Sequence, residues 1–346
     1  MHRCIELARL GAGNTRSNPM VGSVLVYNER IIGEGYHSRY GEAHAEVNCI
    51  NSVSAADQQF ITRSTIYVSL EPCAHFGKTP PCADLIIAKN IKHAVIGCRD
   101  PFEAVNGKGI DKLKAAGINV ELGTLEKECR ELNKRFFTFH TRHRPYIILK
   151  WAQTADHMIG NLTAERLMIT NDFSNRMVHK WRREEMGIMV GTNTALADNP
   201  SLNTRLWPGN DPVRVIIDLK LRLPHTLKLF DGNTQTLVFN SLKTDEKHNI
   251  RFIQVDADTD PFKQILMHLY DLQITSLLIE GGGKLLQSFI DEGCWDEARV
   301  FTNTRMFSGK GIAAPVLQKP GLSHMEQLEN DTLQYFYNPL KTEELY

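Results

Sequence analysis

The chain has 346 residues, of which 42% are hydrophobic and 23% charged, and its 40 Lys and Arg balance its 40 Asp and Glu. This length exceeds one ordinary core and predicts two domains. A formal net charge of zero argues against a general nucleic-acid binder, whose affinity for phosphates comes chiefly from clustered positive charge. No apolar run reaches the roughly 18 residues of a membrane-spanning helix, and no apolar signal segment begins the sequence.

Seven cysteines, an odd number, give no sign of a disulfide framework. Five of them have no partner at metal-ligand spacing, namely Cys4, Cys49, Cys98, Cys129 and Cys294. We expect these five to be reduced, mostly buried thiols of a cytoplasmic protein.

The sequence opens with alternating helix and strand patterns. The first elements are predicted as an amphipathic helix, a hairpin, a second helix and a strand, over residues 5–10, 21–35, about 43 onward, and 65–70. That strand delivers Glu71-Pro72-Cys73 at its carboxyl end, where open α/β sheets place their sites.

His44, Glu46, Cys73 and Cys82 carry the chemistry predicted for the first half of the chain. An imidazole and two thiolates are three zinc ligands, and they leave the fourth tetrahedral position to water. Zinc lowers the pKa of that water to about 7, and a nearby glutamate can move its proton to a leaving amine. His-x-Glu alone, or the two Pro-Cys pairs alone, can occur by chance. The order His-x-Glu and then Pro-Cys, taken whole, favours a zinc deaminase.

The rest of the first half is predicted as strand, helix, strand and one long amphipathic helix, over residues 93–97, 109–116, 118–122 and 125 to about 139. Asn106-Gly107-Lys108-Gly109 is either a phosphate loop or a plain turn, and the missing P-loop spacing favours the turn. Alternation of helices and strands predicts a three-layer α/β sandwich.

The polar segment 141–145 ends in Pro145 and precedes a fresh apolar strand, so the domain boundary is expected there. The two domains would span residues 1–143 and 146–346. Further strands are predicted over 146–151, 187–191, 213–218, 236–239 and 276–280, with helices over 171–185 and 261–272. No strand runs into G-x-G-x-x-G, which excludes a standard Rossmann site. Instead, Gly281-Gly282-Gly283 precedes a predicted helix, and backbone N–H groups at such a helix start favour the binding of an anion.

Longer motifs identify a family. NPMVG at 18–22, GEGYH at 33–37 and PCAHFGKTPPC at 72–82 resemble the deaminase half of the bifunctional riboflavin-biosynthesis deaminase/reductases, including a C-x8-C spacing in place of the usual C-x2-C. The G-x-x-T run from Gly191 and the D-x-P-x-L-x-x-R run from Asp198 resemble the reductase half. The resemblance covers nearly the whole chain.

For the first domain, the resemblance implies a cytidine-deaminase-like α/β/α fold that holds zinc through His44, Cys73 and Cys82, with Glu46 as proton shuttle. The implied reaction removes the 2-amino group of 2,5-diamino-6-(5-phosphoribosylamino)pyrimidin-4(3H)-one by hydrolysis. The implied substrate-binding residues are Asn18, His37, His75, Lys78 and Asp100.

For the second domain, the resemblance implies a dihydrofolate-reductase-like α/β fold that reduces the ribosyl group to ribityl with NADPH. The implied NADPH-binding residues are Ala152, Met168, Thr194, Asp198, Gly281, Gly282 and Gly283. The implied substrate-binding residues are Arg166, Arg182, Leu202, Arg205 and Glu280. Arg166 and Met168 stand where the family usually has Ser and Trp, so we expect a phosphate contact from the former and looser nicotinamide packing from the latter.

Lys150, in the strand-end pattern Lys-x-Ala, is the predicted catalytic residue of the reductase, together with Asp198. Hydride addition at C1 of the sugar needs a proton donor or a cation nearby, and a lysine can supply either. Asp198 and Glu280 would hold Lys150 and the ribose hydroxyls in place. The alternative is an ordinary buried salt bridge.

Two other classes of function remain open at this point. A nucleic-acid-editing deaminase would need a basic, aromatic-lined channel for the strand. A non-catalytic protein with structural zinc would need a fourth protein ligand. The partners expected are a small phosphoribosylated pyrimidine and further copies of the chain, as a dimer or larger, with no nucleic acid and no membrane.

Overall fold

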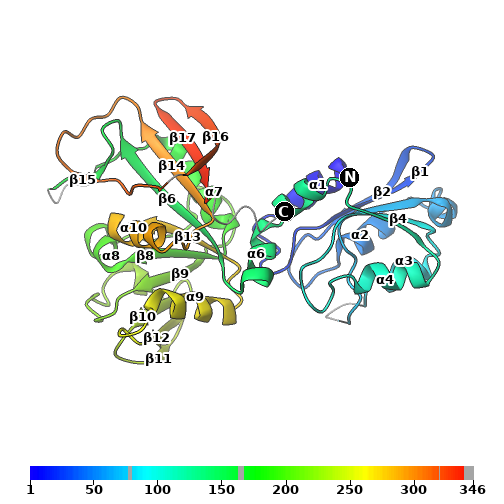
Figure 1. Cartoon of the computed structure of the whole chain (residues 1–346), viewed down its shortest axis with the longest axis horizontal. Helices are drawn as coiled ribbons and strands as arrows, with labels where there is room; N and C mark the ends of the chain where they lie inside the picture. The colour runs from blue at the N-terminus through cyan, green and yellow to red at the C-terminus, as the bar shows by residue number, and fades with distance from the viewer. Residues whose placement is uncertain (77–79, 163–166, 319, 339–346) are drawn as a thin grey trace. The chain divides into compact units, whose positions relative to one another are not determined.

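The computed structural model describes residues 1–76, 80–162, 167–318 and 320–338. The chain forms two compact units, Met1–His143 and Arg144–Tyr346 (Figure 1). Both units are mixed α/β, as predicted. Among the described residues, no helix has the length and apolar character that crossing a membrane requires.

The first unit is built on a five-stranded sheet with the order β2-β1-β3-β4-β5. Its strands are β1 (Gly22–Tyr27), β2 (Arg30–Tyr36), β3 (Thr65–Leu70), β4 (His93–Cys98) and β5 (Asn119–Leu122). β1 runs antiparallel to β2 and to β3, whereas β3, β4 and β5 are parallel. The chain therefore leaves β3 toward Cys73, and β4 toward Asp100, at the same edge of the sheet.

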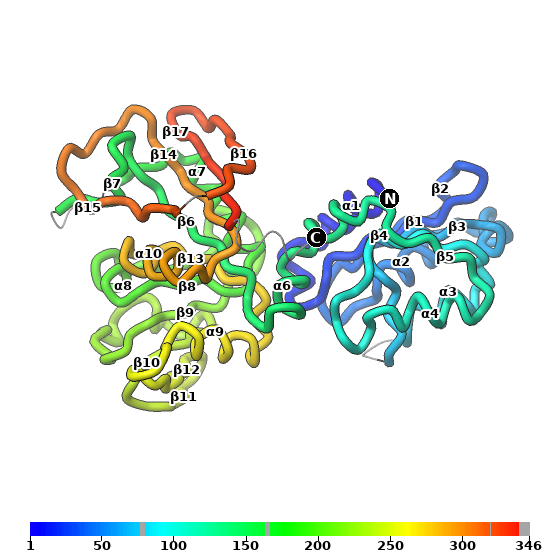
Figure 2. Tube along the Cα trace, in the orientation of Figure 1, coloured from blue at the N-terminus to red at the C-terminus, as the bar shows by residue number. Residues whose placement is uncertain are grey.

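Helices cover both faces of this sheet and make three layers (Figure 2). Side chains alternate along β1, so that Val24 packs with Leu7 of α1 (His2–Arg9), whereas Leu25 packs in the opposite core. Helix α5 (Glu126–Leu132) lies with α1. The opposite layer contains α2 (Ala45–Asn51), α3 (Cys82–Ala88) and α4 (Lys108–Ala115), and a 3₁₀ helix spans Gln58–Arg63.

The long helix predicted from Leu125 to about Phe139 is wrong, because the structure divides it at Asn133. α5 ends at Leu132 and α6 spans Lys134–Arg142. Asn133 lies between them with φ −109° and ψ 23°, and its buried side chain bonds the backbone of Met20. A long-range bond thus replaces the continuation of the helix.

The second unit is built on a ten-stranded sheet with the order β11-β12-β10-β9-β8-β13-β6-β14-β17-β16. The seven strands from β12 to β14 in this order are parallel, and β11, β17 and β16 add antiparallel edges. The strands are β6 (Tyr146–Thr154), β8 (Gly187–Gly191), β9 (Val213–Ile217), β10 (Thr236–Asn240), β11 (Asp245–Lys247), β12 (Ile250–Gln254), β13 (Ser276–Gly281), β14 (Glu297–Asn303), β16 (Gly321–Leu328) and β17 (Asp331–Tyr337). A small separate pair joins β7 (Met158–Gly160) to β15 (Ile312–Ala313).

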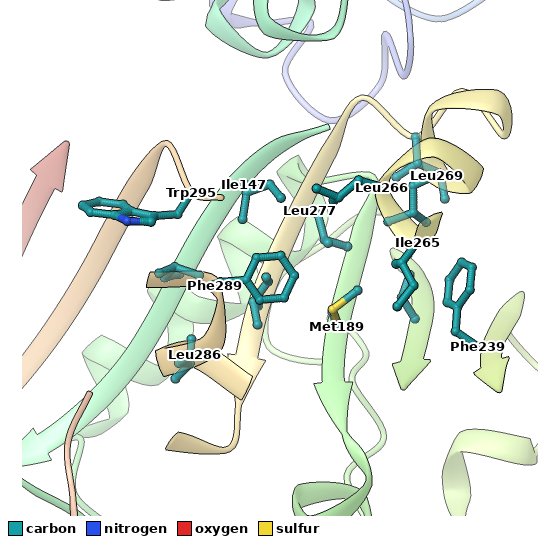
Figure 3. Packing of buried hydrophobic residues seen from close by; sticks show 14 of the residues in the cluster. Ile147, Met189, Phe239, Ile265, Leu266, Leu269, Leu277, Leu286, Phe289 and Trp295 are labelled. Atoms are coloured by element: carbon teal, nitrogen blue, oxygen red, sulfur yellow. The ribbon is translucent and has the colours of Figure 1, made fainter. Parts of the chain in front are cut away.

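Helices again lie on both faces. Figure 3 shows α9 (Pro261–Asp271) and α10 (Gly283–Asp291) covering one face, where Leu266 and Phe289 pack with Ile147 and Leu277. α7 (Asp172–Glu184) and α8 (Thr192–Asp198) cover the other face, and a short 3₁₀ helix spans Lys228–Phe230. Side chains along β6 point alternately to the two faces of the sheet. Those of its even-numbered residues, Lys150 included, lie on the face that α7 covers.

Candidate active sites

The predicted zinc ligands of the first unit lie together at helix starts and at a strand end. His44 is the N-cap of α2, Cys73 follows β3, and Cys82 is the first residue of α3. Nδ1 of His44 lies 3.5 Å from Sγ of Cys73 and 3.4 Å from Sγ of Cys82. The three ligand atoms lie within 4.8 Å of one another, and no other described His, Cys, Asp or Glu joins the group.

This geometry fits zinc. A tetrahedral ion with Zn–N bonds of about 2.05 Å and Zn–S bonds of about 2.3 Å holds its nitrogen and sulfur ligands about 3.6 Å apart, close to the distances found. Hydrogen bonds from Cys82 and from His44 lower the pKa of the Cys73 thiol, which favours the thiolate form that a metal ligand needs. Three protein ligands leave one tetrahedral position for water, which favours a catalytic site over a structural one.

Glu46 lies beside this group. It is the second residue of α2 and only 3% exposed. Burial, with the nearby charge of Cys73, raises the pKa of the Glu46 carboxyl to about 7, and the Cys82 side chain lies within hydrogen-bond reach of it. A carboxyl group in this place can exchange a proton with a water molecule bound at the three ligands.

His37 and Asn18, both expected to bind substrate, are bonded to each other. Nδ1 of His37 lies 3.1 Å from the carbonyl oxygen of Ala43, which only accepts, so Nδ1 carries the proton. Nε2 of His37 then accepts from the side-chain amide of Asn18 at 3.1 Å. Burial lowers the pKa of His37, which keeps the ring neutral, and its centroid lies 5.4 Å from that of His44. The structure thus brings Asn18 and His37 to the zinc group.

Asp100 is buried at the same edge of the sheet. Burial, together with the charges of Glu71 and Cys73, raises the pKa of its carboxyl to about 7. Its backbone N–H donates to Oε2 of Glu71, two residues before Cys73, at 3.2 Å. Its Oδ1 accepts from the backbone N–H of Phe102 at 2.7 Å. The exposed His75 contacts the Phe102 ring edge-on, with centroids 6.0 Å apart. Lys78 lies outside the described residues.

In the second unit, Glu280 and Arg182 form a buried two-point ion pair. Nε and Nη2 of Arg182 each donate to one oxygen of Glu280 at 2.7 Å. Burial opposes the charge on Glu280, but Arg182 and Lys150 together lower its pKa below the ordinary value. Lys150 lies on the neighbouring strand with Nζ 5.7 Å from the ring centre of Phe301. Glu280 therefore holds Arg182 directly and acts on Lys150 through its charge.

The predicted cofactor residues Thr194, Gly281 and Gly282 contact one another, and Gly283 follows them in the chain. A Cβ atom on Gly281 would lie 2.9 Å from Cγ2 of Thr194, and one on Gly282 would lie 3.0 Å from its Oγ1. Gly282 has a φ of +79°, which disfavours any larger residue, and Gly283 begins α10. The turn therefore presents backbone groups at a helix start, beside a threonine hydroxyl.

The other predicted reductase residues are placed as follows. Leu202 is buried with φ +52°, and Asp198, Arg205 and Met168 are exposed, the last by 61%. Asp198 is the last residue of α8, whereas both carboxylate oxygens of Glu280 accept from Arg182. Ala152 lies on β6 opposite Phe301, and Arg166 lies outside the described residues.

Sequence reasoning missed two buried groups near these sites. His179 on α7 is 4% exposed, and burial with the charges of Arg182 and Arg205 lowers its pKa to about 4. Its buried Nδ1 has no hydrogen-bond partner among the described residues. Glu71 is 4% exposed and accepts from four backbone N–H groups. The signal for Glu71 was a charged residue placed directly between an apolar strand and Pro72-Cys73.

Comparison with known proteins covers both units. The model for the RibD C-terminal domain matches residues 145–334, and that for the cytidine and deoxycytidylate deaminase zinc-binding region matches residues 1–98. The riboflavin biosynthesis protein RibD of Aquifex aeolicus is 38% identical over 90% of this chain and 88% of its own length. That of Bacillus amyloliquefaciens is 37% identical over 95% and 90%.

Solved structures agree with this. A diaminohydroxyphosphoribosylaminopyrimidine deaminase/5-amino-6-(5-phosphoribosylamino)uracil reductase from Thermotoga maritima matches with a TM-score of 0.89 and 36% identity over 97% of each chain. RibD of Acinetobacter baumannii matches with a TM-score of 0.88 and 32% identity, also over 97% of each chain. The family expected from the motifs is confirmed: the chain belongs to the RibD family of bifunctional riboflavin-biosynthesis deaminase/reductases.

Proposed function

We propose that the first unit deaminates 2,5-diamino-6-(5-phosphoribosylamino)pyrimidin-4(3H)-one and that the second unit reduces the ribosyl group of the product with NADPH. The observation that carries the proposal is the group formed by His44, Cys73 and Cys82 with Glu46 beside it. We assign the deaminase to residues 1–143 and the reductase to residues 146–346.

In the first unit, bound zinc would supply a water molecule of lowered pKa. Glu46 is the buried carboxyl group next to the ligands, and it would move a proton from the attacking water to the leaving amine. His37, held neutral, orients the Asn18 amide, whose Oδ1 has no donor within the described part of the chain and is free to accept from the pyrimidine. Asp100 and His75 complete the substrate-binding side in this proposal, together with Lys78.

In the second unit, bound NADPH would supply the hydride. Lys150 stabilises or protonates the sugar oxygen or nitrogen released at C1, while Glu280, whose pKa is lowered by Arg182 and Lys150, fixes Arg182. Arg182 also donates to the backbone oxygen of Asn203 at 3.0 Å. It thereby joins Glu280 to the segment that carries Leu202 and Arg205, the proposed substrate contacts.

The remaining assignments rest on the family pattern. We propose that Arg166 contacts the substrate, and that NADPH contacts are made by Ala152, Met168, Thr194, Asp198 and Gly281, Gly282 and Gly283. None of the described cysteines is joined in a disulfide, which supports a reducing compartment such as the cytoplasm. A homo-oligomer remains a prediction.

Neither alternative class of function has support from the site. A structural zinc site would have a fourth protein ligand, and the described residues provide three. A strand-binding deaminase would need excess positive charge, and the chain carries none.

Incubation of the purified protein with the diaminopyrimidinone phosphate tests the proposal. Without NADPH, we expect release of ammonia and accumulation of the deaminated ribosyl compound. With NADPH, we expect the deaminated ribityl compound and consumption of NADPH. Absence of ammonia release from protein that holds zinc would overturn the deaminase assignment, and absence of NADPH oxidation with deaminated substrate would overturn the reductase assignment.

A further inference from the structure

The carboxylate of Glu71 is held by backbone N–H groups from two separate segments. Its Oε2 accepts from Asp100 at 3.2 Å and from Gly107 at 3.0 Å. Its Oε1 accepts from Gly109 at 3.0 Å and from Ile110 at 3.2 Å. All four bonds are buried, so the carboxylate has replaced its water shell by fixed donors.

Three of the four donors, Gly107, Gly109 and Ile110, lie in or directly after the glycine-rich turn 106–109, for which the sequence left a phosphate loop as an alternative. Gly107 has a φ of +88° and caps α4, and a Cβ atom on Gly109 would lie 2.0 Å from the carbonyl oxygen of Pro72. This turn does bind an anion at a helix start, as such turns favour. The anion is the chain's own Glu71, and these N–H groups are therefore not available to a phosphate.

Glu71 also connects two parts of the deaminase site. It stands directly before Pro72 and the zinc ligand Cys73, and it holds the backbone N–H of Asp100. The carboxylate of Asp100 is fixed in turn by the N–H of Phe102 at 2.7 Å. A shift of the segment 100–110 would thus move Asp100 relative to Cys73, and Glu71 is the side chain that joins the two.

We propose that Glu71 is a positioning residue for deamination: its carboxylate fills the anion-binding turn at 107–110 and thereby fixes Asp100 beside the zinc ligands. The inference rests on the deaminase function proposed above, with Asp100 as a substrate contact. Glu71 touches neither substrate nor metal in this account and acts through Asp100.

Glu71→Gln tests this role, because the amide nitrogen of Gln would point its hydrogens at two N–H donors while the shape is kept. We expect one zinc per chain, unchanged NADPH oxidation with deaminated substrate, and a fall in kcat/KM for deamination of about 10- to 100-fold, the size that a displaced substrate contact produces. Glu121→Gln is the matched control, since Glu121 is an exposed glutamate on β5, and it should deaminate like the wild type.

A double-mutant cycle with Asp100→Asn separates positioning from general destabilisation. If Glu71 acts through Asp100, Glu71→Gln should lower kcat/KM by less than about threefold in the Asp100→Asn background. The inference would be overturned if the losses in kcat/KM of Glu71→Gln and Asp100→Asn multiplied fully in the double variant. It would also be overturned if Glu71→Gln deaminated at the wild-type rate.

If Glu71→Gln does not fold, Glu71→Asp takes its place in the same cycle, because it keeps the charge and shortens the reach. Loss of zinc from both variants would also overturn the inference, since Glu71 would then be required for the metal site itself. Wild-type protein that holds zinc without deaminating would contradict the proposed function instead.

Discussion

The side-chain amide of Asn133 pairs with the backbone of Met20, 113 residues earlier in the chain. Its Oδ1 accepts from the N–H of Met20 at 2.8 Å, and its Nδ2 donates to the Met20 carbonyl oxygen at 2.9 Å. Both hydrogen-bonding groups of Met20 are therefore satisfied by one side chain. This pairing fastens the segment that carries Asn18 to the junction of α5 and α6.

Asn133→Ala should lower the free energy of unfolding by about 2–4 kcal/mol, because two backbone groups lose their partner. Urea denaturation measures the change. Asn51→Ala, an exposed position at the end of α2, is the control and should stay within about 0.5 kcal/mol of the wild type. Equal stability of the two variants would show that water replaces the Asn133 amide without cost.

The same pairing shows where sequence patterns stop being informative. Leu132, Phe136 and Phe139 continue a helical spacing across Asn133, and nothing local in the sequence marks the interruption. The partner that ends the helix lies in another part of the chain. By contrast, the hairpin of β1 and β2 was predictable, because Asn28 and Glu29 form a local turn with positive φ values of 45° and 62°.

Strand β14 was missed for a related reason. Glu297 and Arg299 made the segment look polar, yet both are buried and bonded to each other at 2.6 Å. Arg299 also lies over the ring of Trp181, 4.6 Å from its centre. Buried charges with tertiary partners are invisible to a hydrophobic pattern, whereas the apolar runs of β3, β6 and β13 predicted those strands directly.

The zinc group was the part of the site that spacing predicted best, since both halves carry rare residue types in a fixed order. The neighbouring roles of Glu71 and His179 depend on N–H groups and charges supplied by distant segments. Those contacts exist only once the sheet has formed, and a single sequence does not show them.

Cys73→Ser and Cys82→Ser should each lose zinc and deamination together, because a hydroxyl is a poor replacement for thiolate. Elemental analysis of purified variants measures the metal. Cys294→Ser serves as the control, since Cys294 lies in the other unit and outside the ligand group, and it should keep one zinc per chain. Full zinc in both ligand variants would remove these cysteines from the site.

Lys150→Met should abolish most NADPH oxidation with deaminated substrate while zinc content and deamination stay intact. The loss follows from removing the cation that faces Glu280 and the proposed sugar site. Thermal unfolding must be recorded alongside, with the exposed Lys263→Met as control. If reduction continues at the wild-type rate and only stability falls, Lys150 is a structural ion-pair partner.

His179 should make the second unit less stable in mild acid. In the unfolded chain His179 binds a proton below about pH 6.5, whereas the folded protein admits it only near pH 4, because burial, Arg182 and Arg205 oppose the charge and Glu280 favours it. The contribution of neutral His179 to the free energy of unfolding is therefore complete above pH 6.5 and is lost as the pH falls toward 4.

The comparison of wild type with His179→Gln isolates this effect, since Gln does not titrate. Between pH 7 and pH 4.5, we expect the wild type to lose about 2 kcal/mol of unfolding free energy relative to His179→Gln. A difference that is constant over this range would mean that His179 titrates in the folded protein near its ordinary pKa.

Glu46→Gln tests the central claim, that one chain carries two separate sites and that Glu46 moves the proton in the first of them. The variant should hold one zinc per chain, because Glu46 is not among the three ligands, and should release no ammonia from the diaminopyrimidinone phosphate. The same preparation should oxidise NADPH at the wild-type rate when given deaminated substrate. Ammonia release near the wild-type rate by zinc-loaded Glu46→Gln would contradict the account.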